Sequence, residues 1–299
     1  MTDLNIAVVG LPGNWSTETL ADAVEQKTGS RLVVDMSEVW LDLHSRELRY
    51  KDHNLCDFDA LIIKKVGAHY CPDTLDRLEM LRVAERAGVR VFNPATNTIR
   101  LVDRLSCTVT LRNHSIPMPH TCIVRDVAAA LNTIQGYGCA IFKPLYSTKA
   151  RGMEVIESTE PENIQREKVQ TFLAHNPTMY IQKKLDLPGQ DLGMVFLGGE
   201  YLGAYARVSR PGSWNTTILS GGKYQAYTAT ADLIDLAYRA QKPFGMDFTT
   251  VDVAESESGP VVFEVSAFGG FRGLKDGTGL DAASLYSDYV IKTLKRGAG

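Results

Sequence analysis

The chain of 299 residues lacks several features that would place it in a specialised class of protein. No apolar run is long enough to cross a bilayer, and Met1–Gly10 carries an acidic residue and only a short apolar stretch, unlike a signal peptide. The five cysteines are widely spaced and form no CxxC pair, which argues against a zinc site and a disulfide framework. These absences predict a cytoplasmic protein with no membrane partner.

Charge of one sign is not in excess either. Lys plus Arg amount to 32 and Asp plus Glu to 35, so the formal net charge is −3. Without a broad positive field, the chain is not expected to bind nucleic acid. The apolar fraction of 44% and the length are typical of a globular protein with two domains or one large composite unit.

The sequence also lacks a GxGxxG dinucleotide fingerprint. Its first apolar run ends in Gly10-Leu-Pro-Gly13, a GxxG segment with a proline inside it. We interpret this segment as a turn at the end of a parallel strand. A dinucleotide-dependent enzyme is therefore the least favoured hypothesis for this chain.

The first third of the chain predicts alternating strands and helices. The clearest amphipathic pattern spans 72–87 and stops at Gly88, as a helix does. Short apolar strands that alternate with such helices predict a parallel sheet covered on both faces. These strands are expected at 6–9, 32–34, 60–63 and 89–92.

After Pro94 the pattern changes. One helix is expected over 97–113, before the break at Ile116-Pro-Met-Pro119, and a final helix over 281–295. The strand-rich sequence between them predicts α+β lobes with antiparallel sheets. Strands are expected at 121–124, 140–143, 179–182, 193–197, 201–208, 245–253 and 261–265.

Two carboxylates occupy neighbouring strands near the C-terminus. Asp252 ends one apolar run, Glu264 interrupts the next, and the segment 255–260 between them reads as a hairpin loop. Antiparallel pairing would place both on one sheet face, where a buried carboxylate needs a cation. Spacing alone leaves two alternatives open, a structural salt bridge or a Mg²⁺ site completed by phosphate oxygens.

Two further segments suit a nucleotide. Lys143 ends an apolar strand and precedes the polar, basic loop 146–152, which suits phosphate oxygens, although most lysines are simply solvated. The extended run 180–185 is suited to an adenine edge, and Asp191 could accept ribose hydroxyls. The alternative for this run is a linker between lobes.

Taken together and in this order, these segments resemble the RimK-like, glutamate-ligase branch of the ATP-grasp superfamily over nearly the full chain. The most specific motif is Val251-Asp252 followed by Gly259-Pro-Val-Val-Phe-Glu264-Val265, with the spacing of the family. The other matching segments are Val102-Asp103-Arg104 before Met118-Pro119, Ile141-Phe142-Lys143, the loop 147–152, Ile181-Gln182-Lys183-Lys184, Gly189-Gln190-Asp191, Arg207 and the tail 273–281.

The resemblance implies a mixed α/β and α+β fold. An N-terminal Rossmann-like (pre-ATP-grasp) domain would span 1–95, and a two-lobed ATP-grasp fold would follow, with a small lobe over 96–185 and a large lobe over 186–299. It also implies an ATP-dependent ligase. Such enzymes phosphorylate a carboxylate, and an amine then attacks the acyl phosphate to give an amide, ADP and phosphate.

The resemblance further implies a set of site residues. Arg207 would be catalytic and would stabilise the transferring phosphoryl group. Asp252, Glu264 and Ser266 would bind Mg²⁺, with Mn²⁺ as a substitute. Lys143 and Arg104 would hold phosphates, and Asp191 the ribose. The residues expected to bind ATP are Arg104, Lys143, Ser147, Thr148, Lys149, Arg151, Gln182, Lys183, Lys184 and Asp191, with the run 182–184 meeting adenine largely through its backbone.

The chain departs from the family at several of these positions. Ser266 stands where the family has asparagine, which leaves open whether one or two metal ions bind. Arg104 replaces a lysine and keeps its charge. Leu192 and Ser220 replace basic residues that read the substrate in relatives, so a different acceptor is expected. Substrate-binding replacements are expected among Arg210, Trp214, Lys223, Phe271 and Arg272, with Trp214 either stacking on an aromatic acceptor or packing.

Three readings of the function stay open at this point. The favoured one is the addition of glutamate or a similar amino acid to a small-molecule acceptor, for instance a pterin- or furan-type cofactor precursor. The others are a ligase that modifies a protein tail, and a non-catalytic ATP-binding sensor on the same fold. The apolar N-terminal domain could also supply the surface of a homo-oligomer.

Overall fold

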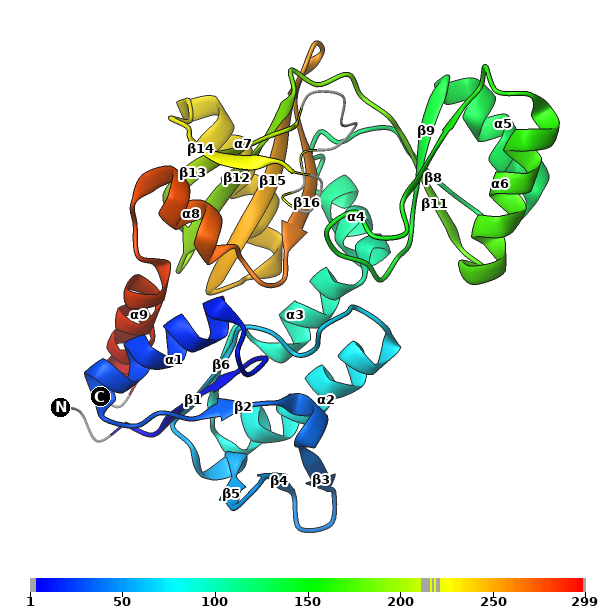
Figure 1. Cartoon of the computed structure of the whole chain (residues 1–299). Coiled ribbons are helices and arrows are strands. Elements are labelled where there is room, and N and C mark those ends of the chain that lie inside the picture. The colour runs from blue at the N-terminus through cyan, green and yellow to red at the C-terminus, as the bar shows by residue number, and fades with distance from the viewer. Residues whose placement is uncertain (1–3, 211–215, 217, 219–220, 298–299) are drawn as a thin grey trace.

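The computed structural model describes residues 4–210, 216, 218 and 221–297. Three larger sheets follow one another along the described chain, and the middle one stands apart from the other two (Figure 1). Trp214 and Ser220 lie outside the described residues. In the described part of the chain, no helix is both long and apolar enough to span a membrane.

The N-terminal sheet is parallel throughout, as its sequence pattern predicts. Its strand order is β2-β1-β6-β7, and all four strands run in the same direction. Helices α1 and α2 each end at a glycine with positive φ, Gly29 at 81° and Gly88 at 102°. The elements are β1 (Ile6–Val9), α1 (Trp15–Thr28), β2 (Val33–Val34), β6 (Ala60–Ile63), α2 (Pro72–Ala87) and β7 (Arg90–Phe92).

A small antiparallel sheet that the sequence analysis did not foresee is inserted between β2 and β6. It consists of β3 (Trp40–Asp42), β4 (Glu47–Tyr50) and β5 (His53–Asn54). Leu48 and Tyr50 on β4 are buried in the same core as the N-terminal sheet.

The single helix expected over 97–113 is wrong, because two helices occupy this segment. They are α3 (Ala95–Val102) and α4 (Arg104–Asn113). Asp103 lies between them in an extended conformation, and its carboxylate accepts a hydrogen bond from the Leu105 amide at 2.9 Å. This N-cap restarts the helix and places Arg104 in its first turn.

The middle sheet is antiparallel and has its own core. Its order is β10-β9-β11-β8, and α5 (Val127–Tyr137) and α6 (Glu162–His175) pack on it around Phe142 and Phe172. The strands are β8 (Thr121–Val124), β9 (Cys139–Lys143), β10 (Glu154–Glu157) and β11 (Met179–Lys183). A separate core allows this sheet to behave as a unit relative to the rest of the chain.

The C-terminal sheet is also antiparallel and carries most of the charged site. Its order is β14-β13-β12-β15-β16. Helix α8 approaches β13 closely because Gly273 faces the Tyr205 ring, where a Cβ atom would lie 2.4 Å from a ring carbon. The elements are β12 (Gln190–Leu197), β13 (Glu200–Val208), β14 (Lys223–Ala226), α7 (Ala231–Gln241), β15 (Phe248–Ser256), β16 (Gly259–Ser266), α8 (Phe271–Thr278) and α9 (Ala282–Gly297).

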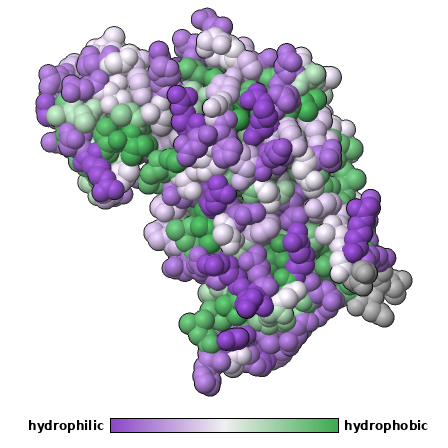
Figure 2. Space-filling model, turned by 180° about the vertical axis from the view of Figure 1, so that it is seen from behind, coloured by the Kyte–Doolittle hydropathy of each residue, from purple (hydrophilic) through white to green (hydrophobic). Residues whose placement is uncertain are grey.

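The N-terminal and C-terminal sheets are joined more firmly than either is to the middle sheet. Asn93, after β7, accepts a hydrogen bond from the Phe248 amide at 2.7 Å and donates one to the Phe248 carbonyl at 2.9 Å. Buried side chains from both sheets belong to one continuous core. On the face in Figure 2, apolar side chains lie in separate patches among hydrophilic ones.

Candidate active site

The C-terminal sheet brings four charged residues from four neighbouring strands together. Asp252 on β15 pairs with Glu264 on β16, because the register of the hairpin shifts by one residue between Asp252 and Val253. On the other side, Asp191 on β12 pairs with Arg207 on β13. Since side chains directly opposite each other in an antiparallel pair share a face, this register gathers the four groups.

Arg207 lies between two of these carboxylates. Its guanidinium forms a bidentate contact with Asp191, through Nε at 3.1 Å and through Nη2, and Nη2 also lies 3.0 Å from Asp252 Oδ2. The other carboxylate oxygen of Asp252, Oδ1, is buried without a hydrogen-bond partner. Burial raises the pKa of Asp252 to about 7, an effect that Arg207 opposes and that Glu264 and Asp191 reinforce.

Arg104 connects α4 to β16 and to the basic loop. Its Nη1 atom lies 3.0 Å from Glu264 Oε2, and its Nε donates to the Pro144 carbonyl at 3.2 Å. Nη2 is 3.4 Å from both the carbonyl and the hydroxyl oxygen of Ser147. The charge of Arg104 is thus directed at the point where β9 ends and the loop begins.

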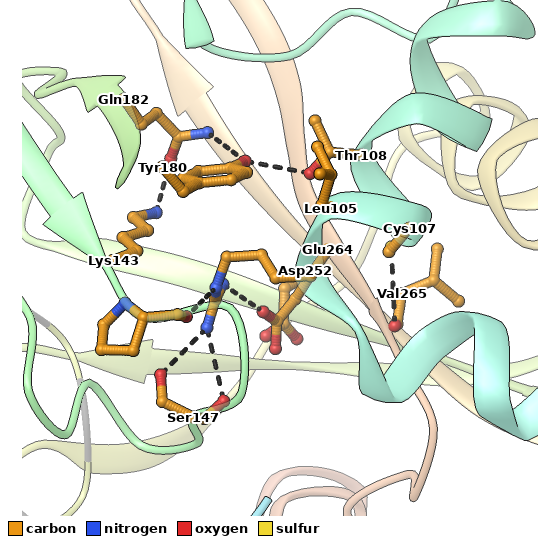
Figure 3. A network of polar contacts seen from close by, with 12 residues as sticks. Leu105, Cys107, Thr108, Lys143, Ser147, Tyr180, Gln182, Asp252, Glu264 and Val265 are labelled. Carbon is orange, nitrogen blue, oxygen red and sulfur yellow. Dashed lines mark hydrogen bonds and ion pairs between the residues drawn. The ribbon is translucent and has the colours of Figure 1, made fainter. Parts of the chain in front are cut away.

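A chain of hydrogen bonds crosses from the middle sheet to α4, as Figure 3 shows. Lys143 donates to Gln182 Oε1 at 2.5 Å, Gln182 Nε2 donates to the Tyr180 hydroxyl at 3.3 Å, and that hydroxyl bonds to Thr108 Oγ1 at 3.0 Å. Burial and the nearby Arg104 cation together lower the pKa of Lys143 to about 7, an effect that Glu264 opposes. This series of hydrogen bonds holds the Lys143 ammonium in place and leaves some of its N–H donors available.

Some backbone amides of the run 182–184 already form hydrogen bonds within the protein. The Lys183 amide donates to the His120 carbonyl at 2.8 Å, and the Lys184 amide donates to the Cys139 carbonyl at 2.9 Å. The Lys183 side chain is exposed, and Lys184 Nζ lies 3.9 Å from Asp186. An adenine edge would therefore meet carbonyls of this run or the amide that follows it.

The carboxylates fit a magnesium ion that is shared with phosphates. Ser266 pairs with Thr250 two positions along from the Asp252–Glu264 pair, so its hydroxyl belongs to the same sheet face. Within the described ranges, no group of three or more His, Cys, Asp and Glu side chains could hold a metal. Two carboxylates with phosphate oxygens completing the shell are a common Mg²⁺ arrangement, and the buried, unpartnered oxygen of Asp252 is a suitable ligand.

The far end of the basic loop turns away from Arg104. Thr148 is half-buried, and its carbonyl accepts from the Arg151 amide at 3.3 Å. Lys149 and Arg151 are exposed, and Arg151 Nη1 lies 2.5 Å from His69 Nδ1, in the loop that follows β6. Only Ser147 of the predicted loop residues contacts the inner charged groups.

The residues expected to bind the acceptor are dispersed. Arg210 and Lys223 are exposed, and Lys223 pairs with Val208 at the edge of the sheet. Trp214 is outside the described residues. Arg272 is the member that meets the N-terminal part of the chain, where its guanidinium carbon lies 4.7 Å from the centre of the Trp15 ring. Phe271 is buried beneath it.

Sequence analysis missed two residues that come from the N-terminal part of the chain. The buried Lys64 donates to the Gly269 carbonyl at 2.6 Å and lies 4.1 Å from the centre of the Phe271 ring. Tyr70 packs edge-on against Phe268, with ring centres 5.9 Å apart. The available signal was the position of Lys64 directly after an apolar strand, because ligands bind at the carboxyl ends of parallel strands.

Comparisons with known proteins agree with this arrangement. The family model described as RimK-like ATP-grasp domain matches residues 102–290. The tetrahydromethanopterin:alpha-L-glutamate ligase of Methanosarcina acetivorans is 24% identical to this chain over 98% of its length and 100% of the relative. A protein of Trichodesmium erythraeum described as "Probable alpha-L-glutamate ligase" is 26% identical, over 98% of each chain.

Solved structures share the fold at low sequence identity. The ATP-grasp ligase PsnB, complexed with a minimal precursor, superposes with a TM-score of 0.75 at 18% identity, covering 97% of this chain and 99% of that one. The RimK domain protein ATP-grasp from Sphaerobacter thermophilus gives 0.75 at 21% identity, covering 95% and 98%. The mixed α/β ATP-grasp fold expected from the motifs is thereby confirmed.

Proposed function

The chain belongs to the RimK-like ATP-grasp family, whose members are carboxylate–amine ligases, and we propose that it joins glutamate to a carboxylate of a small-molecule acceptor. Two curated relatives described as glutamate ligases support glutamate as the amine. The tetrahydromethanopterin ligase of Methanosarcina acetivorans also supports a pterin-type acceptor. A furan-type cofactor precursor is the alternative acceptor.

The observation that carries the proposal is the set of charge pairs in the inner site, which we define as Arg104, Lys143, Asp191, Arg207, Asp252 and Glu264. Arg104 is paired with Glu264, and Arg207 with Asp191 and Asp252. In each pair, the cation could bind a phosphate. The neighbouring carboxylate could bind a metal ion or a ribose. MgATP carries both complementary charges, so it can replace these contacts without leaving a buried charge unpaired.

The reaction follows from these positions. A carboxylate oxygen of the acceptor attacks the terminal phosphorus of ATP, and the bond to ADP breaks. Lys143 and Arg104 bind phosphate oxygens, and Arg207 stabilises the negative charge on the transferring group. The amine then attacks the acyl carbon and loses a proton, and phosphate leaves. Asp252 and Glu264, with Ser266 as a weaker donor, would hold Mg²⁺, which neutralises phosphate charge when bound.

We further propose a separate role for each of the three larger sheets. Residues 1–95 would act as a Rossmann-like domain that presents the acceptor, and 96–185 would include the lobe that closes over ATP. Residues 186–299 would carry the metal and ribose ligands. The separate core of the middle sheet supports closure, which keeps water from the acyl phosphate.

The test is ADP release with MgATP, glutamate and a fractionated small-molecule extract, each omitted in turn, with products followed by mass spectrometry. We expect extract-dependent release and a product heavier by one glutamate residue. Glu264→Gln should lower the rate by about 100-fold or more, whereas Glu257→Gln, in the exposed loop of the same hairpin, should not. Tight MgATP binding without an amide product from any fraction would contradict the proposal and favour a sensor.

A further inference from the structure

Two consecutive lysines follow β6 at the carboxyl edge of the N-terminal sheet. The amides of Lys64 and Lys65 both donate to the Val9 carbonyl, at 2.8 and 3.1 Å. Lys64 is buried against Gly269, whereas Lys65 is half-buried. Burial lowers the pKa of Lys65, and so do the nearby Lys149 and Arg151 cations. Arg151 also contacts His69 in the loop that follows β6, so the loop that carries Lys149 and Arg151 meets the segment that begins with Lys64.

The basic loop is held in place there. Arg151 can only donate, so its Nη1 contact of 2.5 Å makes His69 Nδ1 the acceptor and orients the guanidinium against the loop between β6 and α2. Lys149 and Ala150 both have left-handed backbone angles, with φ of 60° and 58°. Two adjacent non-glycine residues in this region are strained, and such strain is found at functional segments.

Among the described residues, no carboxylate forms an ion pair with these cations. Within the part of the chain that the structure describes, Lys65, Lys149 and Arg151 form no ion pair with Asp or Glu, in contrast to Lys184, which faces Asp186. Like charges brought together without a counter-charge raise the free energy of the folded state. A bound anion would remove that cost.

We propose that Lys65, Lys149 and Arg151, with His69 orienting Arg151, form an outer rim that binds a carboxylate of the acceptor other than the one that reacts. The inference rests on the proposed ligase function and narrows the acceptor to a compound with at least two carboxylates. A chain that already ends in glutamate has this chemistry.

The terminal phosphate of ATP is the other anion that these cations could bind. The positions of two groups of residues favour the acceptor carboxylate over this phosphate. Ser147, at the near end of the loop, lies beside Arg104, whereas Lys149 and Arg151 extend away from it to the N-terminal sheet. Lys65 and His69 belong to that sheet and its following loop, where ligands of parallel sheets bind. The outer rim thus faces the N-terminal sheet, whereas Arg104, which we propose to bind phosphate, lies at the other end of the loop.

The test is direct binding to the full-length protein without ATP, using tri-L-glutamate and the uncharged tri-L-glutamine as matched probes. We expect calorimetry to show that wild type binds tri-L-glutamate at least about tenfold more tightly than tri-L-glutamine. Lys65→Gln and Arg151→Gln should each remove most of this preference. Lys51→Gln, at an exposed lysine in the turn between β4 and β5, should keep it.

Nucleotide binding distinguishes the two possible anions, the acceptor carboxylate and the terminal phosphate of ATP. Both rim variants should bind ADP and a non-hydrolysable ATP analogue as wild type does, within about twofold. Equal binding of the two tripeptides by wild type, or a loss of ATP-analogue affinity as large as the loss for tri-L-glutamate, would overturn the proposal. Neither outcome depends on turnover, so a failed ligase assay with a retained tri-L-glutamate preference would count against the proposed function alone.

Discussion

The inner site and the outer rim both concentrate charge, but they satisfy it differently. In the inner site, Arg104 and Arg207 are each in contact with carboxylates of the C-terminal sheet, and both guanidinium groups are largely buried. At the outer rim, Lys65 and Arg151 come from separate segments and have no carboxylate neighbour among the described residues.

The difference shows that one fold contains two kinds of charged site, one with its charges paired within the protein and one with unpaired cations among the described residues. The inner pairs keep the site folded before the nucleotide arrives, because a buried charge without a partner is costly. The rim lies nearer to water, so its cations can remain unpaired at a smaller cost and attract an anion. Removing a cation should therefore destabilise the protein in the inner site and not at the rim.

The largest effect is expected for Arg207→Ala. The substitution leaves Asp191 and Asp252 buried without their cation, so the free energy of unfolding should fall by about 3–5 kcal/mol. Urea unfolding measures this change. Arg239→Ala is the matched control, since Arg239 forms an exposed pair with Asp235 and should cost less than about 0.5 kcal/mol. Similar losses in the two variants would remove the distinction between inner and surface pairs.

A smaller decrease in the free energy of unfolding is expected for Gln182→Leu. The substitution leaves Lys143 and the Tyr180 hydroxyl without a hydrogen-bond partner that the wild type provides. Unfolding should become easier by about 1–3 kcal/mol, whereas Gln170→Leu, at an exposed position of α6, should change it by less than about 0.5 kcal/mol. A Gln182 variant as stable as wild type would show that the chain to Thr108 does not hold the middle sheet.

Lys64 should couple stability to pH. Burial lowers its pKa in the folded protein to about 7, and an unfolded lysine titrates near ~10.4. Between these values the unfolded chain binds a proton that the folded chain has released, so the free energy of unfolding rises with pH. Wild type should therefore gain stability relative to Lys64→Met between about pH 7 and about pH 9.

The comparison with Lys64→Met isolates one group, because Lys143 titrates in both proteins. Denaturant unfolding at the two pH values provides the measurement, and Lys242→Met, at an exposed position, should follow the wild-type profile. A constant difference between wild type and Lys64→Met across this range would mean that Lys64 is not held in a low-dielectric environment.

The smallest effect is expected at the rim. Lys149→Asn removes one of three clustered cations, and asparagine tolerates the left-handed backbone found there. The free energy of unfolding should stay the same or rise by up to about 0.5 kcal/mol. A clear loss of stability in thermal or urea unfolding would show that an unrecognised contact, rather than ligand binding, holds Lys149 in place.

The inner site could be predicted largely from local sequence. The hairpin places Asp252 and Glu264 on neighbouring strands, and a carboxylate inside an apolar strand requires a cation. Their direct pairing also depends on the register shift between Asp252 and Val253, which the sequence pattern does not reveal. Arg104 was found through its motif, although the helix around it was predicted as continuous. The break at Asp103 depends on one capping hydrogen bond, which a hydrophobic pattern does not reveal.

The residues that sequence analysis missed depend on contacts between distant segments. Lys64 meets Gly269, and His69 meets Arg151, only after the N-terminal sheet packs against the rest of the chain. No local pattern encodes these pairs. The prediction that Lys149 and Arg151 bind ATP followed their place in the loop and stays a prediction, whereas the contact of Arg151 with His69 was not foreseen.

The most direct test of the central claim is the fate of the carboxylate oxygen. The acceptor identified by ADP release would be prepared with heavy oxygen in its carboxylate, and the released phosphate analysed by mass spectrometry. The account predicts one heavy oxygen in each phosphate, because the carboxylate attacks phosphorus and its oxygen leaves with the phosphate. Unlabelled phosphate alongside amide product would contradict an acyl-phosphate intermediate, and with it the role assigned to the inner site.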